Sequence, residues 1–360
     1  MKFALFLKKN FVFIFLLCTV FALAVEIFLR LTGTNAFYIQ SPRFFEANFQ
    51  YDSYFGWVGK PNYVMNMTDH PGLAVLKFDS RGFIISPHVQ NDPVVNTRKI
   101  LFIGACDSFG GPALGPEQGY VDMLAADLNS QFDFDVFGVS GYSFYQEYLL
   151  QKKYNQGGYD IVFVSFYAPF YFYLDTHYAL MEFGNRFCPH PHYSNGILSH
   201  NPVPYIKSYW EQTLPFQERF NLKEKIFIKS YLLSKIMRNI ITIKSFNPGL
   251  TRHIAETFRE DVEQKGGKMV ILIYNFPAVP YTATAKTTDA FIEWLQENRF
   301  DYIDFRKYFK DKPLSDYTTL KTIGDPTHFN YSAQIIFKNV IAEYLHAVDL
   351  LKKNQERTTS

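Results

Sequence analysis

The order of apolar and polar positions divides the chain into an apolar N-terminal segment, an irregular region and a long region of repeating short elements. From residue 99 onward, short apolar runs that suit buried parallel strands are separated by segments with helical spacing of apolar residues. Strands that alternate with helices predict an α/β fold with a doubly wound parallel sheet between two layers of helices. The predicted strands are 99–104, 134–139, 160–168, 268–274 and 301–305, and the predicted helices are 120–128, 142–153, 251–265, 288–298 and 331–351.

Two regions depart from this alternation. Residues 31–98 are dense in turn-forming residues and have no helical periodicity, which predicts an extended preamble that packs on the α/β domain. Residues 175–250 form an insertion within the predicted domain of residues 99–351, loop-rich to about residue 205 and then helical over residues 223–244. Residues 352–360 are a polar tail.

The N-terminal segment has the features of a membrane anchor. Residues 11–29 form an almost continuous apolar run, about as long as a bilayer-spanning helix requires. Lys2, Lys8 and Lys9 precede the run, which predicts a cytoplasmic N-terminus and a main domain in the periplasm. A cleaved signal peptide is the alternative, but no small-x-small cleavage site lies at the right distance. An uncleaved inner-membrane anchor over residues 1–30 is therefore favoured.

Composition narrows the classes of function. Of the 360 residues, 48% are hydrophobic, so the chain can bury a large core and is not generally disordered. The formal net charge is only +2, which provides no field for binding nucleic acid. Three cysteines, far apart in the sequence, do not indicate a disulfide framework. The 38 Phe and 25 Tyr suit a large core, a membrane-adjacent surface or a carbohydrate groove alike.

Candidate chemistry lies after three elements of the predicted fold. Ligands of open α/β sheets bind at the carboxyl ends of the strands. The first strand ends in Gly104-Ala-Cys-Asp-Ser-Phe-Gly-Gly111, a tight turn of the kind that exposes a nucleophile such as Ser108. The second is followed by Gly138-Val-Ser-Gly-Tyr-Ser143, whose glycine amides suit an oxyanion. Asp325-Pro-Thr-His328 precedes the last helix, and a carboxylate there can orient the imidazole as a general base.

These three motifs, in this order, resemble the SGNH/GDSL hydrolase superfamily. The apolar segment ending in Glu-x-x-x-Arg and the Gly-Trp and Phe-Asp-Ser-Arg-Gly-Phe elements of the preamble are similar to those of bacterial membrane-anchored members. The resemblance implies an SGNH-like, flavodoxin-like three-layer fold and a catalytic site of Ser108, Asp325 and His328. It also implies that the amides of Ser108 and Gly141 hold the oxyanion, with no cofactor and no metal.

The sequence departs from the family pattern at two places. Cys106 stands where Gly-Asp-Ser has its glycine, and a register without gaps makes Cys106 the nucleophile instead. We choose Ser108 because triad chemistry is built around a hydroxyl, with Cys106 as the alternative because a thiolate beside a histidine is competent. The family asparagine after the third strand is also missing, which leaves Ser165 or Tyr167 as substitute oxyanion donors.

Two functions follow from these motifs. The first is an esterase or acyl-transfer enzyme that acts on an acylated glycan or lipid of the cell envelope. The second is a catalytically degenerate protein of the same fold that binds a glycan or an envelope protein partner. A metal site at Cys188, His190 and His192, with His177 and His200 nearby, is disfavoured because prolines stiffen the segment and the spacing is unusual for zinc.

Overall fold

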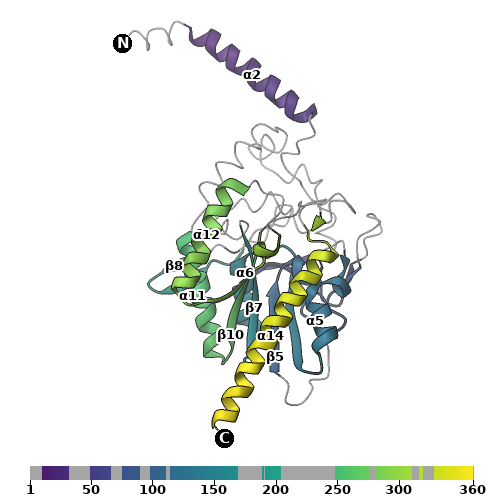
Figure 1. Ribbon diagram of the computed structural model, residues 1–360. Helices are drawn as coiled ribbons and strands as arrows, with labels where there is room; N and C mark the ends of the chain where they lie inside the picture. Colours follow the sequence, from purple (N-terminus) through teal and green to yellow (C-terminus); the bar gives the residue numbers. More distant parts are fainter. Residues whose placement is uncertain are drawn as a thin grey trace.

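The central element of the fold is a five-stranded parallel sheet with helices on both faces (Figure 1). The strands are β5 (Arg98–Gly104), β6 (Phe132–Gly138), β7 (Ile161–Ala168), β10 (Lys268–Asn275) and β11 (Asp301–Asp304). They lie in the order β11-β10-β7-β5-β6, so the predicted doubly wound α/β sheet is confirmed. The computed structural model describes residues 10–31, 49–65, 75–89, 98–110, 114–168, 189, 191–203, 248–275, 281–309, 316–318 and 328–359.

The two faces of the sheet are covered by different helices. Phe163 of β7 meets Tyr344 of α14 with ring centroids 5.8 Å apart, whereas Phe166 stacks on Phe291 of α12 at 4.5 Å. Odd and even positions of β7 point to opposite faces, as alternation along a strand requires, and both faces are apolar because both are covered. The helices are α5 (Tyr120–Leu128) and α14 (Tyr331–Thr359) on one face, and α6 (Phe144–Tyr154), α11 (Pro248–Gln264) and α12 (Tyr281–Glu297) on the other.

The strand order places the topological switch point of the sheet beside β5. The chain steps from β5 outward to β6 and then crosses to β7 on the other side of β5. Connections from adjacent strands therefore diverge at the carboxyl ends of β5 and β7, which is where open α/β sheets bind ligands. The predicted nucleophile turn follows β5 directly, so the fold brings it to this switch point.

The preamble contributes two small antiparallel sheets and a share of the core. β1 (Phe49–Asp52) pairs with β2 (Gly56–Gly59), and β3 (Val64–Met65) pairs with β4 (Leu76–Lys77). Phe83 is buried and its ring lies 5.3 Å from that of Phe137 on β6. The preamble therefore shares the hydrophobic core of the parallel sheet.

Of the predicted insertion, the structure describes residues 189, 191–203 and 248–250. β8 (Pro191–Ser194) and β9 (Ile197–His200) form a hairpin, and Tyr193 stacks on His253 of α11 with ring centroids 3.9 Å apart. The helical stretch expected near residues 223–244 lies outside the described residues.

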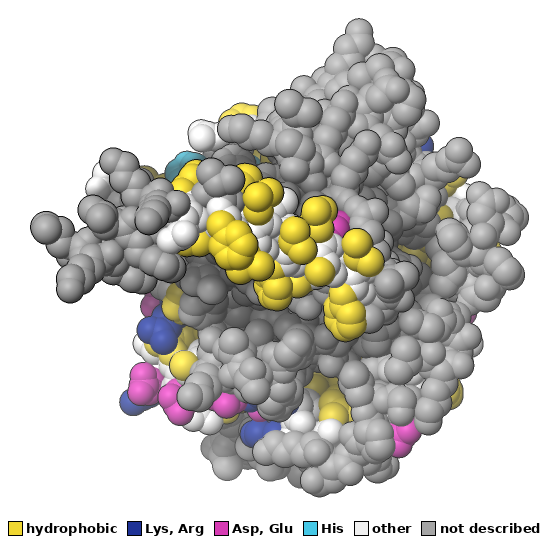
Figure 2. All heavy atoms as spheres, turned by 90° about the horizontal axis from the view of Figure 1, so that it is seen from above, with side chains coloured by type: hydrophobic (Ala, Val, Ile, Leu, Met, Phe, Trp, Pro, Cys, Tyr) yellow, Lys and Arg dark blue, Asp and Glu magenta, His cyan; other side chains and the backbone are white. Residues whose placement is uncertain are grey.

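The apolar N-terminal run forms the helix α2 (Phe11–Leu31). Its large side chains are exposed, and Figure 2 shows a band of hydrophobic side chains over it. Over the residues whose side chains the structure describes, no helix is long and apolar enough to cross a membrane. The anchor at residues 11–29 stays a prediction.

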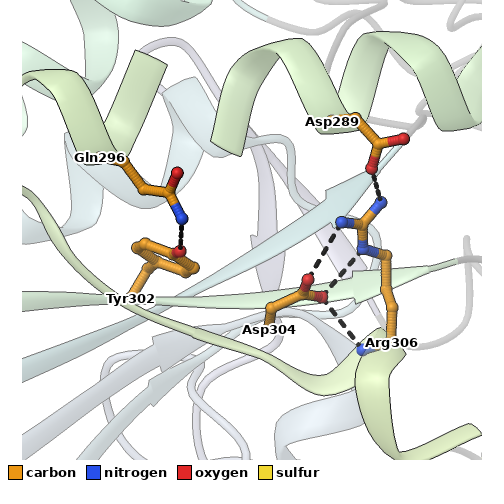
Figure 3. A network of polar contacts seen from close by, with 5 residues as sticks. All are labelled: Asp289, Gln296, Tyr302, Asp304 and Arg306. Carbon is orange, nitrogen blue, oxygen red and sulfur yellow. Dashed lines mark hydrogen bonds and ion pairs between the residues drawn. The ribbon is translucent and has the colours of Figure 1, made fainter. Parts of the chain in front are cut away.

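A polar network ties the edge strand β11 to α12 (Figure 3). The Arg306 guanidinium donates to both carboxylate oxygens of Asp304, at 2.8 and 3.0 Å, and to Asp289 of α12 at 2.8 Å. The Gln296 amide donates to the Tyr302 hydroxyl at 2.6 Å. Because the Asp304 side chain is 4% exposed, its charge needs this partner, and the network has a structural role at the sheet edge.

Candidate active site

The candidate nucleophile turn leaves β5 at the switch point of the sheet. Residues Cys106–Phe109 form the 3₁₀ turn η1, and the Ser108 amide donates to the Ala105 carbonyl at 3.1 Å. The Cys106 side chain is half-buried, and its Sγ lies 3.3 Å from Nε2 of His328. At that distance the thiol and the imidazole can exchange a proton directly.

His328 is held by the backbone that leads into α14. The next residue, Phe329, is buried and pairs with Thr318 in an isolated antiparallel bridge. Asn330 then accepts a hydrogen bond from the Ala333 amide at 3.1 Å and so caps the first turn of α14. The bridge and the cap fix the chain just after His328, which places its ring beside η1.

Asp325, the predicted orienting carboxylate, lies outside the described residues. Its hydrogen bond to the other ring nitrogen of His328 therefore stays a prediction. The nitrogen that faces Cys106 is Nε2, the one that acts as base when a carboxylate holds Nδ1.

The Ser108 hydroxyl is turned into the core. Ser108 is 1% exposed, its Oγ lies 3.1 Å from Oγ of Ser165, and it accepts a hydrogen bond from the Tyr120 hydroxyl at 3.3 Å. In a 3₁₀ turn each residue rotates by about 120°, so side chains two positions apart face different directions. The structure thus brings the alternative nucleophile, Cys106, to His328.

The loop after β6 contacts the nucleophile turn. The Val139 amide donates to the Gly104 carbonyl at 3.3 Å. A Cβ on Gly138 would lie 2.1 Å from a ring carbon of Phe109, so the absence of a side chain allows this ring to pack there. Gly141 is half-buried and has φ +77°, a left-handed conformation that favours glycine. The predicted oxyanion residue therefore lies in a loop that adjoins η1.

The end of β7 offers no asparagine, and both predicted substitutes are buried. Ser165 is occupied by the contact to Ser108. Tyr167 is 3% exposed and its ring stacks on that of Tyr274, with centroids 5.1 Å apart and planes at 14°. Their roles as oxyanion donors stay predictions.

Sequence reasoning did not predict that the preamble holds the loop after β6. Trp57 Nε1 donates to the Ser140 carbonyl at 3.3 Å, and the Tyr142 hydroxyl donates to the Trp57 carbonyl at 2.5 Å. The Gln146 side-chain amide donates to the Phe55 carbonyl at 2.7 Å. The available signal was the tryptophan itself, because a buried indole N–H requires an acceptor.

The histidines of the insertion do not form a described metal site. His192 and His200 lie on the β8–β9 hairpin, whereas Cys188, His190 and His177 lie outside the described residues. Among the side chains that the structure describes, no three His, Cys, Asp or Glu are placed to hold a metal ion.

No family model and no curated protein sequence matches the chain. Solved structures that it resembles include a lipase/acylhydrolase from Enterococcus faecalis (14% identity, TM-score 0.41, covering 69% of this chain and 95% of the other). A second is a G-D-S-L family lipolytic protein from Veillonella parvula (8% identity, TM-score 0.40, covering 69% of this chain and 97% of the other). A third is an acetylxylan esterase from Geobacillus stearothermophilus (11% identity, TM-score 0.37, covering 68% of this chain and 93% of the other).

Proposed function

We propose that this chain is a cysteine-dependent ester hydrolase or acyl-transfer enzyme of the SGNH/GDSL superfamily. The observation that carries the proposal is the 3.3 Å contact between Cys106 Sγ and His328 Nε2, which joins residues 222 positions apart in the sequence. The proposal keeps His328 as the base and replaces Ser108 by Cys106 as the nucleophile. A half-buried thiol beside an imidazole at the carboxyl edge of the sheet is the arrangement that nucleophilic catalysis requires.

The two side chains account for every proton transfer of an acyl-transfer cycle. Nε2 of His328 takes the thiol proton as the Cys106 sulfur attacks the carbonyl carbon of the ester. The tetrahedral oxyanion then collapses, the imidazolium returns the proton to the departing alkoxide, and a thioester remains on Cys106. Next, Nε2 deprotonates water or an acceptor hydroxyl, which attacks the thioester. The acid or the new ester leaves, and the thiolate of Cys106 regains the proton.

We assign the oxyanion to the backbone amides of Cys106 and Gly141. The contacts between the loop after β6 and the nucleophile turn support this pair. Loss of one oxyanion donor typically costs about 100- to 1000-fold in rate, so a site without the family asparagine is expected to turn over slowly unless the substrate supplies a good leaving group.

The proposed substrate is an acylated glycan or lipid of the cell envelope. The basic residues Lys2, Lys8 and Lys9 and the exposed apolar side chains of α2 support a membrane anchor with the catalytic domain outside the inner membrane. Such an enzyme would meet acyl groups of envelope polymers close to the bilayer. The distribution of the protein between membrane and soluble fractions, with and without residues 1–31, tests the anchor.

The nucleophile is tested on the full-length protein in detergent with p-nitrophenyl acetate as substrate. We expect Cys106→Ala and His328→Ala to abolish turnover above background, because each removes half of the proton-transferring pair. The matched control is Cys18→Ala, since Cys18 is an exposed thiol on α2, and this variant should keep wild-type turnover.

The outcomes separate the competing functions. Turnover that survives Cys106→Ala but is lost in Ser108→Ala would restore the serine mechanism. A folded wild-type protein that neither turns over the ester nor forms a hydroxylamine-sensitive acyl adduct would support the degenerate binding protein instead.

A further inference from the structure

We infer that Trp57 of the preamble is a positioning residue for this site: its indole holds the Ser140–Gly141 peptide so that the Gly141 amide is presented as an oxyanion donor. The inference rests on the proposed function. It assigns a catalytic contribution to a segment that lies outside the parallel sheet.

The geometry of one peptide unit carries the argument. Trp57 Nε1 donates to the Ser140 carbonyl at 3.3 Å. A trans peptide is planar, with its C=O and the following N–H pointing in opposite directions. The indole that captures the Ser140 carbonyl therefore directs the Gly141 N–H away from the preamble.

The Ser140–Gly141 peptide needs an external restraint because its second residue is glycine. Gly141 has φ +77°, and glycine accepts positive and negative φ about equally well. Type I and type II turns differ mainly by a flip of their central peptide, and glycine makes both accessible. With the indole bond in place, only one of the two orientations keeps the Ser140 carbonyl paired.

Trp57 is itself held firmly. Its side chain is fully buried, and its backbone pairs with Tyr51 across the β1–β2 hairpin. Its carbonyl accepts from the Tyr142 hydroxyl at 2.5 Å, and the two rings meet edge to face with centroids 5.5 Å apart. Trp57 thus donates to the loop at Ser140 and accepts from it at Tyr142, and only the first of these bonds ends on the Ser140–Gly141 peptide.

The loop that Trp57 holds is in contact with the nucleophile turn. The Ile84 amide of the preamble donates to the Gly138 carbonyl at 3.2 Å, and Gly138 lies against the Phe109 ring of η1. The chain of contacts therefore runs from the preamble through the loop to the turn that carries Cys106. A change at Trp57 is expected to affect the stabilised oxyanion rather than the thiol–imidazole pair.

The test compares two variants that each remove one hydrogen bond between Trp57 and the loop. Trp57→Phe keeps an aromatic ring and removes the N–H that orients the Ser140 carbonyl. Tyr142→Phe removes the hydrogen bond from the Tyr142 hydroxyl to the Trp57 carbonyl and leaves the Ser140 carbonyl paired with the indole. We expect Trp57→Phe to lower kcat for p-nitrophenyl acetate by about 10- to 100-fold with KM unchanged, a part of the cost of losing an oxyanion donor. Tyr142→Phe should stay within a few-fold of wild type.

A second readout separates orientation of the amide from damage to the site. Alkylation of Cys106 by iodoacetamide needs the thiolate and forms no oxyanion, so its rate should be the same in wild type and Trp57→Phe. If Trp57→Phe does not fold, benzothienylalanine at position 57 keeps the ring shape and replaces only the N–H by sulfur. Its kcat should fall in the same way.

Two results would count against these ideas in different ways. Equal kcat in wild type, Trp57→Phe and Tyr142→Phe, with turnover dependent on Cys106, would overturn the positioning role and leave the proposed function standing. Absence of Cys106-dependent turnover in the folded wild type would remove the proposed function, and the positioning role with it.

Discussion

Replacement of Ser108 by alanine separates a structural serine from a catalytic one. The Ser108 hydroxyl lies 3.1 Å from that of Ser165 and accepts a bond from Tyr120 at 3.3 Å, all in the core. The alanine variant removes one hydrogen-bond partner from each of two buried hydroxyls, those of Ser165 and Tyr120. A buried polar group that loses its partner costs about 1–3 kcal/mol, so the free energy of unfolding should fall by an amount of this order. Turnover of p-nitrophenyl acetate should stay within a few-fold of wild type.

The magnitude can be checked by thermal unfolding. For a domain of 150–250 residues, about 1 kcal/mol shifts Tm by about 2–4 °C, so Ser108→Ala should lower Tm by roughly 2–12 °C. Removing both members of a hydrogen-bonded pair leaves fewer groups unsatisfied than removing one. The double variant Ser108→Ala/Ser165→Ala should therefore be less destabilised than the sum of the single variants.

The opposite pattern would refute this reasoning. If Ser108→Ala leaves Tm unchanged and abolishes turnover, the hydroxyl acts on substrate and not on the core. If both quantities are unchanged, the described hydrogen bonds contribute nothing measurable, and the assignment of Ser108 to the core network fails.

Three further predictions concern the site and its surroundings. Gly138→Ala should lower the free energy of unfolding by about 1–3 kcal/mol, measured by urea unfolding, and should also lower turnover, because the new Cβ displaces the Phe109 ring. Wild-type stability together with wild-type turnover would contradict this close packing. Cys106→Ser should lose the rapid iodoacetamide reaction and most esterase activity, whereas full activity would exclude a special role for sulfur. Burial lowers the pKa of His200 below 6.5, so the unfolded state binds protons more readily; stability should be full above pH 6.5 and fall toward pH 5. A Tm series over pH should show a smaller fall in His200→Gln.

Much of the fold was predictable because its strands are read from continuous apolar runs. β7 is buried on both faces, and its sequence has only Ser165 among apolar and aromatic residues. Such runs between helical segments indicate a parallel sheet, and the sheet in turn predicts where a site must lie. His328 was predicted as a candidate base in this way, because it directly precedes the last predicted helix.

The choice between Cys106 and Ser108 was not predictable in the same way. Both follow the same strand and differ by two positions, so the strand pattern places both at the carboxyl end of β5. Which one meets His328 depends on how the chain turns within η1. This 3₁₀ turn has only four residues, too few for a pattern of apolar positions to predict which side chain points to the histidine. The preference for a hydroxyl came from chemistry in general, whereas the register without gaps already pointed to the sulfur.

The hydrogen bond from Trp57 to the Ser140 carbonyl could not be predicted for a different reason. Its partner Ser140 is 83 positions away, and the bond ends on a backbone carbonyl, which carries no sequence signal. Contacts of this kind depend on how the preamble packs against β6, and single-sequence patterns do not encode that packing.

The shared core of the preamble and the parallel sheet defines what counts as one cooperative unit. A single cluster of buried side chains extends from Phe49 to Leu345 and includes Trp57 and Phe83. A shorter chain that began at residue 98 would keep all five strands and yet expose the surface of Phe137 that Phe83 covers. The intact protein should accordingly lose its preamble and its sheet in one unfolding transition, and the domain boundary that matters for a truncated protein lies ahead of residue 49.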